Sequence, residues 1–344
     1  MQRVWFNKTF SSVAAAIRLI RQADAAANSV SDYHIVCSNT NPHAPAFLAA
    51  HESAVEPSGL KGDAYLDWCL HFCRVNRIGI FVPGKEAGLV SAAREQFAQL
   101  GTRVLCAASQ HVLDLLHDKA RFYQTVDVQL APPAAFRVVE TVAQFDAAYR
   151  ELRQQHPTLC IKPSQSVYGL GFSVIDEERS SAQLLLEGVQ YHIGLDDLRR
   201  GFAAMDGFRT MLVMEYLDGH EYSVDCVGDN GRLVCAIARK KALVAGQGQT
   251  IDMREDILES TRQLTAAYGL NGIFNVQFRE GRNGLGLLEI NPRMSGGIAM
   301  ACLAGPNLPY LALRGFDRGF DGLRIAPIRA GIRVGELAHA TELP

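Results

Sequence analysis

The segment Leu287–Arg293, which reads Leu-Leu-Glu-Ile-Asn-Pro-Arg, places polar side chains at fixed intervals in an otherwise apolar stretch. Successive side chains of a β-strand alternate between its two faces. Glu289 and Asn291 therefore share one face, while Leu288 and Ile290 take the other. The segment predicts a strand with an acid and an amide side by side.

A second run with the same alternation lies just upstream. Ile273–Phe278 places Asn275 and Gln277 on one face. The intervening Glu280–Gly284 contains glycine and asparagine, which favour a tight turn. The two runs therefore predict a β-hairpin in which Gln277 lies opposite or near Glu289.

The polar side chains of this hairpin are hard oxygen donors. Gln277, Glu289 and Asn291 together suit Mg²⁺, which prefers carboxylates, amide oxygens, waters and phosphates. Arg293 follows the strand end and can hold an anion in its planar fork. The alternative is a hairpin with a polar outer face and a proline-terminated strand. We favour a site for a metal ion and phosphate.

Composition sets broad limits. The 344 residues suggest two or three domains, and 48% hydrophobic with 20% charged residues is typical of a globular protein. A net charge of −2 gives no support to nucleic-acid binding. No apolar run approaches the roughly 20 residues that cross a bilayer, and the polar start argues against a signal peptide. The 8 cysteines form no Cys-x-x-Cys pair, so we expect reduced thiols and a cytoplasmic location.

The pattern of apolar runs divides the chain near residue 110. Residues 1–110 alternate short strands with helices, which predicts an α/β region with a parallel sheet. The later region mixes helices with antiparallel strands and is expected to be α+β. Within it we expect helix over 180–206 and a strand at Ile328–Val334. Tyr222–Val227 and Arg232–Lys241 are expected to form a hairpin.

Three further polar groups are candidates for binding a nucleotide. Lys162 ends a strand and precedes a small, glycine-containing loop, which can surround an anion or simply connect two strands. Glu215 and Glu221 flank a tight turn, which suits either a polar sheet edge or adenine and ribose. Arg239 lies in a basic strand end, either solvated or neutralising phosphate or an acidic substrate.

Two other patterns are set aside. Gly79–Glu86 approaches the spacing of a P-loop, but it has glutamate where the metal-binding Ser or Thr belongs and strand residues inside the loop. His111 and His117 flank acidic residues at helical spacing, and a solvated helix face explains them better than a metal site.

In this order along the chain, the motifs resemble the ATP-grasp superfamily, above all the large-subunit modules of carbamoyl-phosphate synthetases. The chain is also similar to the smaller ATP-grasp proteins found beside tellurium-resistance-type operons. The resemblance covers residues 115–305 with specific motifs and the N-terminal region by topology only. It implies a pre-ATP-grasp α/β domain at 1–110, an ATP-grasp region with antiparallel sheets at 111–305 (subdomains at about 115–215 and 215–305) and a closing segment at 306–344.

The resemblance also implies roles for individual residues. It implies lysines on the ATP phosphates, a glycine-rich flap over them, a hinge strand for adenine and a carboxylate for ribose: Lys119, Lys162, Ser164, Gly169, Gly171, Glu215, Tyr216, Leu217 and Glu221. Gln277, Glu289 and Asn291 match the ligands of Mg²⁺ or Mn²⁺. Arg293 matches the catalytic arginine that steadies the transferred phosphoryl group or acyl phosphate.

The implied activity is an ATP-dependent, ADP-forming ligase that activates a small-molecule carboxylate for attack by an amine. A small-molecule kinase and a catalytically silent ATP-binding module are the alternatives. A homodimer is the habit of the family, and neither nucleic acid nor membrane is expected as a partner. Met294–Gly297 departs from the serine-rich run of carbamoyl-phosphate synthetases, which argues against bicarbonate as substrate.

Overall fold

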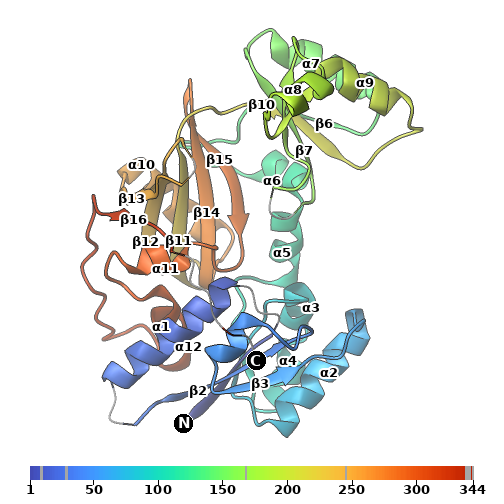
Figure 1. The fold of residues 1–344 in the computed structure, drawn as a ribbon. Coiled ribbons are helices and arrows are strands. Elements are labelled where there is room, and N and C mark those ends of the chain that lie inside the picture. The colour runs from blue at the N-terminus through green and yellow to red at the C-terminus, as the bar shows by residue number, and fades with distance from the viewer. Residues whose placement is uncertain (8–10, 28–29, 167–168, 245, 338–341, 343–344) are drawn as a thin grey trace. The chain divides into compact units, whose positions relative to one another are not determined.

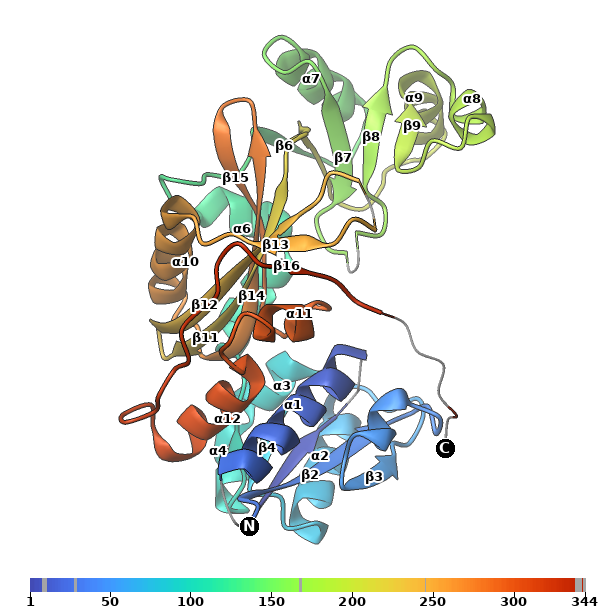
Figure 2. The same ribbon diagram turned by 60° about the vertical axis from the view of Figure 1, so that its left-hand side comes forward.

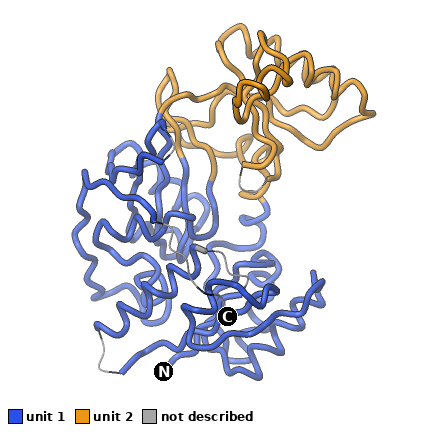
Figure 3. The backbone as a smooth tube through the Cα atoms, in the orientation of Figure 1, with its two compact units in different colours: residues 1–114, 220–277, 290–344 blue, residues 115–219, 278–289 orange. Residues whose placement is uncertain are grey.

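The computed structural model describes residues 1–7, 11–27, 30–166, 169–244, 246–337 and 342 (Figures 1 and 2). The chain forms two compact units (Figure 3). Unit 1 contains residues 1–114, 220–277 and 290–344, and unit 2 contains residues 115–219 and 278–289. The units interleave along the chain, whereas the predicted domains are consecutive segments whose boundaries stay a prediction.

Unit 1 begins with a five-stranded parallel sheet in the order β3-β2-β1-β4-β5, which confirms the predicted α/β region. Its strands are β1 (Gln2–Phe6), β2 (Tyr33–Asn39), β3 (Glu52–Val55), β4 (Ile80–Val82) and β5 (Arg103–Val104). Its α-helices are α1 (Ser11–Ala27), α2 (Gly62–Val75), α3 (Ala87–Ala92) and α4 (Arg94–Gln99). A 3₁₀ helix, η1 (Pro45–Leu48), lies in the connection between β2 and β3. The sequence missed β3 because this edge strand is largely exposed and has no apolar alternation.

Both faces of this sheet are buried, as expected for parallel strands. Val4 and Ile80 belong to a core cluster on one face that includes residues of α1 and α12 (Leu308–Arg318). These two helices lie side by side (Figures 1 and 2). On the other face Trp5 stacks on Phe81, with ring centroids 4.1 Å apart, and also contacts Phe72 of α2. Alternate residues of β1 therefore hold helices on opposite sides of the sheet.

Unit 2 contains a five-stranded mixed sheet in the order β6-β10-β7-β8-β9. The strands are β6 (Phe136–Val139), β7 (Leu159–Pro163), β8 (Ser173–Asp176), β9 (His192–Gly194) and β10 (Met211–Glu215). Two helices precede it, α5 (Gln110–His117), which begins in unit 1, and α6 (Lys119–Thr125). The amphipathic α7 (Val142–Arg153) packs on the sheet through Phe145 and Leu152.

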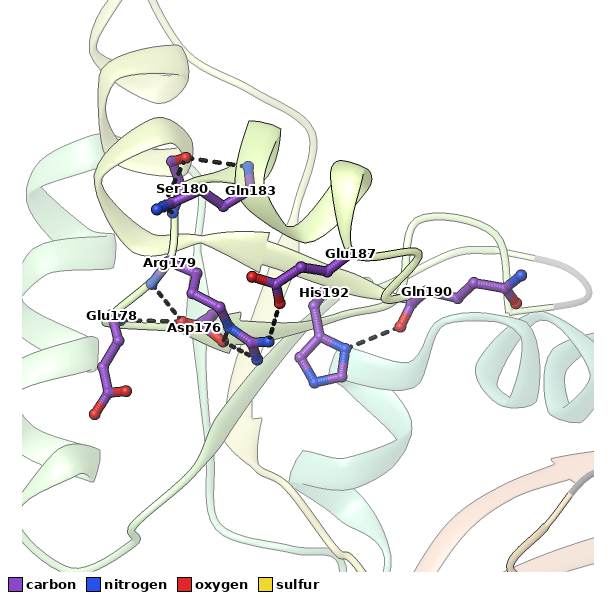
Figure 4. A network of polar contacts seen from close by, with 8 residues as sticks. All are labelled: Asp176, Glu178, Arg179, Ser180, Gln183, Glu187, Gln190 and His192. Carbon is purple, nitrogen blue, oxygen red and sulfur yellow. Dashed lines mark hydrogen bonds and ion pairs between the residues drawn. The ribbon is translucent and has the colours of Figure 1, made fainter.

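The expectation of helix over 180–206 is wrong in its middle. The segment contains α8 (Ser181–Leu186), then β9, then α9 (Leu195–Ala203). Gly188 and Tyr191 have φ of +70° and +59°, which stops α8 and lets β9 pair with β8. Figure 4 shows the polar contacts around this turn. The Asp176 carboxylate accepts hydrogen bonds from Arg179, whose guanidinium also reaches Glu187.

A six-stranded sheet has the order β15-β14-β11-β12-β13-β16. Its strands are β11 (Glu221–Asp229), β12 (Arg232–Lys241), β13 (Gln249–Ile251), β14 (Gly272–Gly281), β15 (Gly284–Asn291) and β16 (Arg333–Val334), with α10 (Glu255–Ala267) between β13 and β14. The β11–β12 hairpin is antiparallel, as predicted.

One expectation near the C-terminus needs correction. The strand expected at Ile328–Val334 is reduced to β16. The proline-containing segment after residue 305 carries α12, because Pro309 lies in its first turn, where no backbone N–H is needed. A short helix, α11 (Ile298–Cys302), precedes it.

The cysteines agree with the expectation of reduced thiols. All 8 cysteines are free, and burial raises the pKa of Cys73 and Cys160 to about 12. Such thiols stay protonated near neutral pH and are poor nucleophiles. Within the described ranges, no helix has the length and apolar character needed to cross a bilayer.

Candidate active site

The predicted site residues divide between the two units. Unit 2 contains Lys119, Lys162, Ser164, Gly169, Gly171, Glu215, Tyr216, Leu217 and Glu289. Unit 1 contains Glu221, Arg239, Gln277, Asn291 and Arg293. Each group is described by itself.

In unit 2 the start of α6 is tied to the end of β7. The Asp118 carboxylate caps α6 by accepting from the N–H groups of Ala120 and Arg121. The backbone N–H of Lys119 donates to the Ser164 carbonyl at 3.0 Å, and the Ala120 N–H donates to the Ser164 hydroxyl oxygen at 3.0 Å. Burial opposes ionisation of Asp118, but the Ser164 hydroxyl and these N–H groups outweigh it, so the pKa of Asp118 lies below its ordinary value. These contacts bring Lys119 and Ser164 together.

Lys119 faces the predicted metal ligand of β15. Its ammonium nitrogen lies 3.3 Å from a carboxylate oxygen of Glu289, and the two side chains are 10% and 27% exposed. The same ammonium donates to the Ser166 carbonyl at 3.4 Å. An ion pair with this little exposure is screened less by solvent than a surface pair. The structure therefore brings together a lysine and a glutamate that lie far apart in the sequence.

Lys162 is linked through Tyr123 to the strand β15 that carries Glu289. Its ammonium donates to the Tyr123 hydroxyl at 2.9 Å and lies 4.9 Å from the centre of that ring. The Tyr123 hydroxyl donates to the backbone carbonyl of Leu288. Burial lowers the pKa of Lys162, although Cys160 and Glu289 act in the opposite direction. Burial and the nearby Glu289 carboxylate also raise the pKa of Tyr123, which stays a neutral donor.

The sequence did not single out Tyr123 or Asp118. Tyr123 lies one turn after Lys119 on α6, a helix that was not predicted. The sequence signal for α6 was Asp118, an aspartate in the position of a helix cap before a helical pattern. The structure gives both residues a place beside the two lysines.

The predicted hinge residues follow β10. The Glu215 carboxylate lies 3.3 Å from Nδ1 of His156, and the Tyr216 N–H donates to the Thr158 carbonyl at 3.0 Å. Arg279 lies over the Tyr216 ring, 5.3 Å from its centre, and donates to the Gly219 carbonyl. The Glu215 side chain is thus held by His156, which the sequence did not reveal.

The side chain of Leu217 packs closely on a glycine, and the two loop glycines have a left-handed backbone conformation. Leu217 is 8% exposed, and a Cβ at Gly281 would lie 2.5 Å from its side chain. Gly169 and Gly171 have φ of +69° and +83°, a region that non-glycine residues rarely adopt. The predicted flap over 164–171 includes residues 167–168, which lie outside the described residues.

In unit 1 Arg239 is the centre of a buried polar network. Its Nε donates to an Asp225 carboxylate oxygen at 2.9 Å, and the two side chains are 2% and 0% exposed. Its other nitrogens donate to the hydroxyls of Ser223 and Ser295, at 3.0 Å each, and to the Gln249 side-chain oxygen. The Arg239 guanidinium donates its hydrogen bonds to other side chains of the protein, so its predicted binding of phosphate stays a prediction.

Asn275 and Gly297 complete this network. The Asn275 side-chain amide donates to Ser223, to the Val224 carbonyl and to Asp225, while its own oxygen is buried without a hydrogen-bond partner. A Cβ at Gly297 would lie 2.5 Å from the Arg239 guanidinium. Arg239 therefore supports the loop that carries Ser295 and Gly297. The sequence signal for the buried partner of Arg239 was Asp225, an aspartate inside the otherwise apolar strand β11.

Of the remaining predicted residues of unit 1, Gln277 lies within β14, whereas Glu221, Asn291 and Arg293 lie at or just beyond strand ends. Glu221 pairs with Lys241, and both side chains are partly exposed. Arg293 donates to the Met294 carbonyl at 2.9 Å, and its backbone N–H donates to the Asn291 carbonyl at 2.7 Å. Arg293 also lines a cavity of unit 1.

The donor set suits a hydrated metal–phosphate complex better than a closed metal cage. Across the described part of the chain, no group of three or more His, Cys, Asp or Glu residues is placed to hold a metal ion. The predicted ligands supply one carboxylate, from Glu289, and two amide oxygens, from Gln277 and Asn291. Mg²⁺ is commonly bound in this way, through one or two carboxylates with waters and substrate phosphates.

Comparison with known proteins shows the same fold. The structure superposes on N5-carboxyaminoimidazole ribonucleotide synthetase in complex with ADP with a TM-score of 0.66 and 13% identity, covering 96% of this chain and 80% of the other. The L-amino acid ligase from Bacillus licheniformis gives a TM-score of 0.62 and 12% identity, covering 92% and 74%. These superpositions show that the chain shares the fold of both enzymes.

Sequence comparison finds an ATP-grasp match in the C-terminal part of the chain. A family described as ATP-grasp in the biosynthetic pathway with Ter operon matches residues 207–340. The arginine-specific large chain of carbamoyl phosphate synthase from Bacillus subtilis is 23% identical over 217 residues, or 59% of this chain. That match covers 19% of the synthase chain, so this chain spans only a small part of the length of its relative.

The buried network predicts a large loss of stability when one charge is removed. Asp225→Ala leaves the Arg239 guanidinium buried without its counter-ion, which typically costs about 3–5 kcal/mol. Asp229→Ala on the same strand is the matched control, because it removes the exposed partner of Arg232 and should change stability by no more than about 1 kcal/mol. Urea unfolding followed by circular dichroism measures both. Equal effects of the two substitutions would contradict the assigned role of the Arg239–Asp225 pair.

Proposed function

We propose that this protein is an ATP-dependent, magnesium-dependent ligase that joins a small-molecule carboxylate to an amine through an acyl phosphate. The observation that carries the proposal is the grouping of Lys119, Lys162 and Glu289 around Tyr123 in unit 2. Lys119 pairs with the Glu289 carboxylate there, while Lys162, from another segment, donates to the neutral Tyr123 hydroxyl. Such a group has spare positive charge for a polyphosphate.

The state of Lys162 supports a phosphate ligand. A buried ammonium whose pKa is lowered by burial lacks sufficient negative charge around it. A nucleotide phosphate would supply that charge and accept charge-assisted hydrogen bonds. Glu215, Tyr216 and Leu217 follow the same sheet and are the proposed contacts for adenine. The synthetase with the same fold was solved in complex with ADP, which supports a nucleotide as a ligand of this fold.

The metal ion has a defined part in the proposal. Gln277, Glu289 and Asn291 would hold Mg²⁺, which when bound withdraws charge from the phosphate oxygens. Lys119 neutralises part of the Glu289 charge in the structure and would share that carboxylate with the metal. The protein residues then position the phosphates and offset their charge, which is the general logic of phosphoryl transfer.

The chemical steps follow from these positions. A carboxylate oxygen attacks the γ-phosphorus, the bond to the β,γ-bridging oxygen breaks, and ADP leaves. The amine then attacks the acyl carbon, phosphate leaves, and the amine loses a proton. Arg293, with its planar fork of donors, would hold the carboxylate and then the acyl phosphate. Holding both reactants in line lowers the entropy cost of the reaction.

Removing either of two side chains should abolish turnover and leave the fold intact. Glu289→Ala removes the one carboxylate among the proposed metal ligands, and Arg293→Ala removes the proposed anion clamp. Each should lower ATP-dependent phosphate release by about 10²-fold or more. Arg282→Ala, at the exposed turn of the β14–β15 hairpin, is the control for arginine removal. Near-wild-type turnover in either test variant, with an unchanged circular dichroism spectrum, would refute the proposal.

Nucleotide binding should depend on pH through Lys162. Its pKa is lowered in the free protein, and a bound phosphate raises it again. ATP affinity should therefore be full below the free-state pKa and fall as pH rises through it, before an ordinary lysine would lose its proton. Lys162→Arg keeps the charge and should remove this fall. Calorimetry above neutrality, in buffers with different ionisation enthalpies, measures affinity and proton uptake. An identical pH profile in Lys162→Arg would contradict the assignment.

A further inference from the structure

A cavity in unit 1 lies at the carboxyl ends of three parallel strands. Its wall includes residues at or just after the ends of β1, β4 and β5, among them Phe6, Val82 and Leu105. Val13 of α1 and Met294 after β15 add further apolar surface. All of these residues belong to unit 1.

The strand order explains why a cavity forms at this position. In the order β3-β2-β1-β4-β5 the chain proceeds outward from β1 in one direction and then returns to add β4 and β5 on the other side. Connections from β1 and β4 therefore leave in opposite directions, which opens a crevice between them. Ligands of open α/β sheets bind in that crevice, outside the carboxyl ends of the strands. The first strand is not followed by a glycine-rich fingerprint, so a dinucleotide is not the expected ligand.

The charges around the cavity define the ligand it suits. Among the described residues that line it, Arg293 is the one with a formal charge, and no aspartate, glutamate or lysine is present. Asn7 also lines it, but Asn7 is 1% exposed and already bonded. Its amide donates to the Tyr65 hydroxyl at 2.8 Å, and its oxygen accepts from the Gly84 N–H at 2.6 Å. The cavity therefore offers one cation and a mainly apolar wall.

Arg293 is positioned to hold an anion at the open side of this cavity. The residue is exposed, whereas Phe6 and Leu105 are 4% and 6% exposed. Its hydrogen bonds to Met294 and Asn291 fix the start of the loop after β15. A carboxylate paired with this guanidinium would leave its hydrocarbon part against the apolar wall.

We propose that this cavity binds the acid that is activated, and that it selects a small monocarboxylate with an uncharged, apolar body. The inference rests on the proposed ligase function and specifies its substrate class. An amino acid would place its ammonium beside the described lining residues, none of which carries a negative charge, and burial of an unpaired charge is strongly unfavourable. A dicarboxylate would bring two negative charges to one guanidinium.

The test compares 3-methylbutanoate with L-valine, which has the same carbon skeleton and an added ammonium. Binding to the full chain is measured by calorimetry without nucleotide. Turnover is measured as ATP-dependent hydroxamate formation, with hydroxylamine as the amine. We expect 3-methylbutanoate to bind at least about 10-fold more tightly than L-valine and to support turnover. Equal or tighter binding of L-valine, or no binding of either compound, would overturn the inference.

Two matched variants test the charge argument directly. Val82→Asp places a carboxylate in the wall, and Val82→Asn places an uncharged side chain of the same shape there. Relative to Val82→Asn, the aspartate variant should bind L-valine at least about 10-fold more tightly and bind 3-methylbutanoate more weakly. The same comparison between Met294→Glu and Met294→Gln applies if the Val82 variants do not fold. If both variants of a pair fold and the acidic variant shows neither tighter binding of L-valine nor weaker binding of 3-methylbutanoate than its amide counterpart, the inference is overturned.

The results separate the inference from the ligase proposal. Hydroxamate formed from L-valine but not from 3-methylbutanoate would overturn the substrate class and leave the ligase function supported. Tight binding of 3-methylbutanoate and the expected exchange of preference, without turnover of any acid, would support the selectivity of the cavity and refute the ligase function.

Discussion

The attachment of α6 to the end of β7 determines where the positive charge of unit 2 lies. The hydroxyl of Ser164, just after β7, donates to the carboxylate of Asp118, which caps α6. The backbone N–H groups of Lys119 and Ala120 donate in turn to the Ser164 carbonyl and hydroxyl oxygens. These contacts fix Lys119 one residue after the cap and Lys162 two residues before Ser164. Because both lysines are anchored through backbone geometry, their ammonium groups converge on Tyr123 and Glu289 without depending on long flexible side chains alone. The proposed anion-binding site would therefore be organised before its ligand arrives.

Unit 1 uses a buried ion pair for a different purpose. Arg239 and Asp225 are almost fully buried, and every group that bonds to the guanidinium belongs to the protein. A buried pair of this kind is weak evidence for net stabilisation, because desolvation offsets the attraction. Its clearer effect is on geometry, since the bond to Ser295 and the close approach to Gly297 hold the loop that follows Arg293. The position of the proposed anion clamp thus depends on a residue that need not touch the substrate.

The sequence was most informative where a local pattern has one structural solution. The alternation in Ile273–Phe278 and Leu287–Arg293 led to β14 and β15, and the turn residues between them occur where a hairpin needs them. Strand and helix alternation likewise predicted the parallel sheet. The sequence was less informative for residues 180–206 and for α12. Positive φ at Tyr191 and a proline in the first helical turn are compatible with more than one local structure, and packing decides among them.

The chain by itself determined the kinds of groups available: oxygen donors on two adjacent strand patterns, lysines at strand and helix ends, and an arginine after a proline. These follow from side-chain periodicity and backbone preferences, which act over a few residues. Only the tertiary structure decided that Lys119 meets Glu289, that Tyr123 stands beside Lys162, and that Arg239 turns to Asp225. The physical reason is that desolvation and ion pairing depend on distances between segments far apart in the chain, and no local pattern encodes those distances.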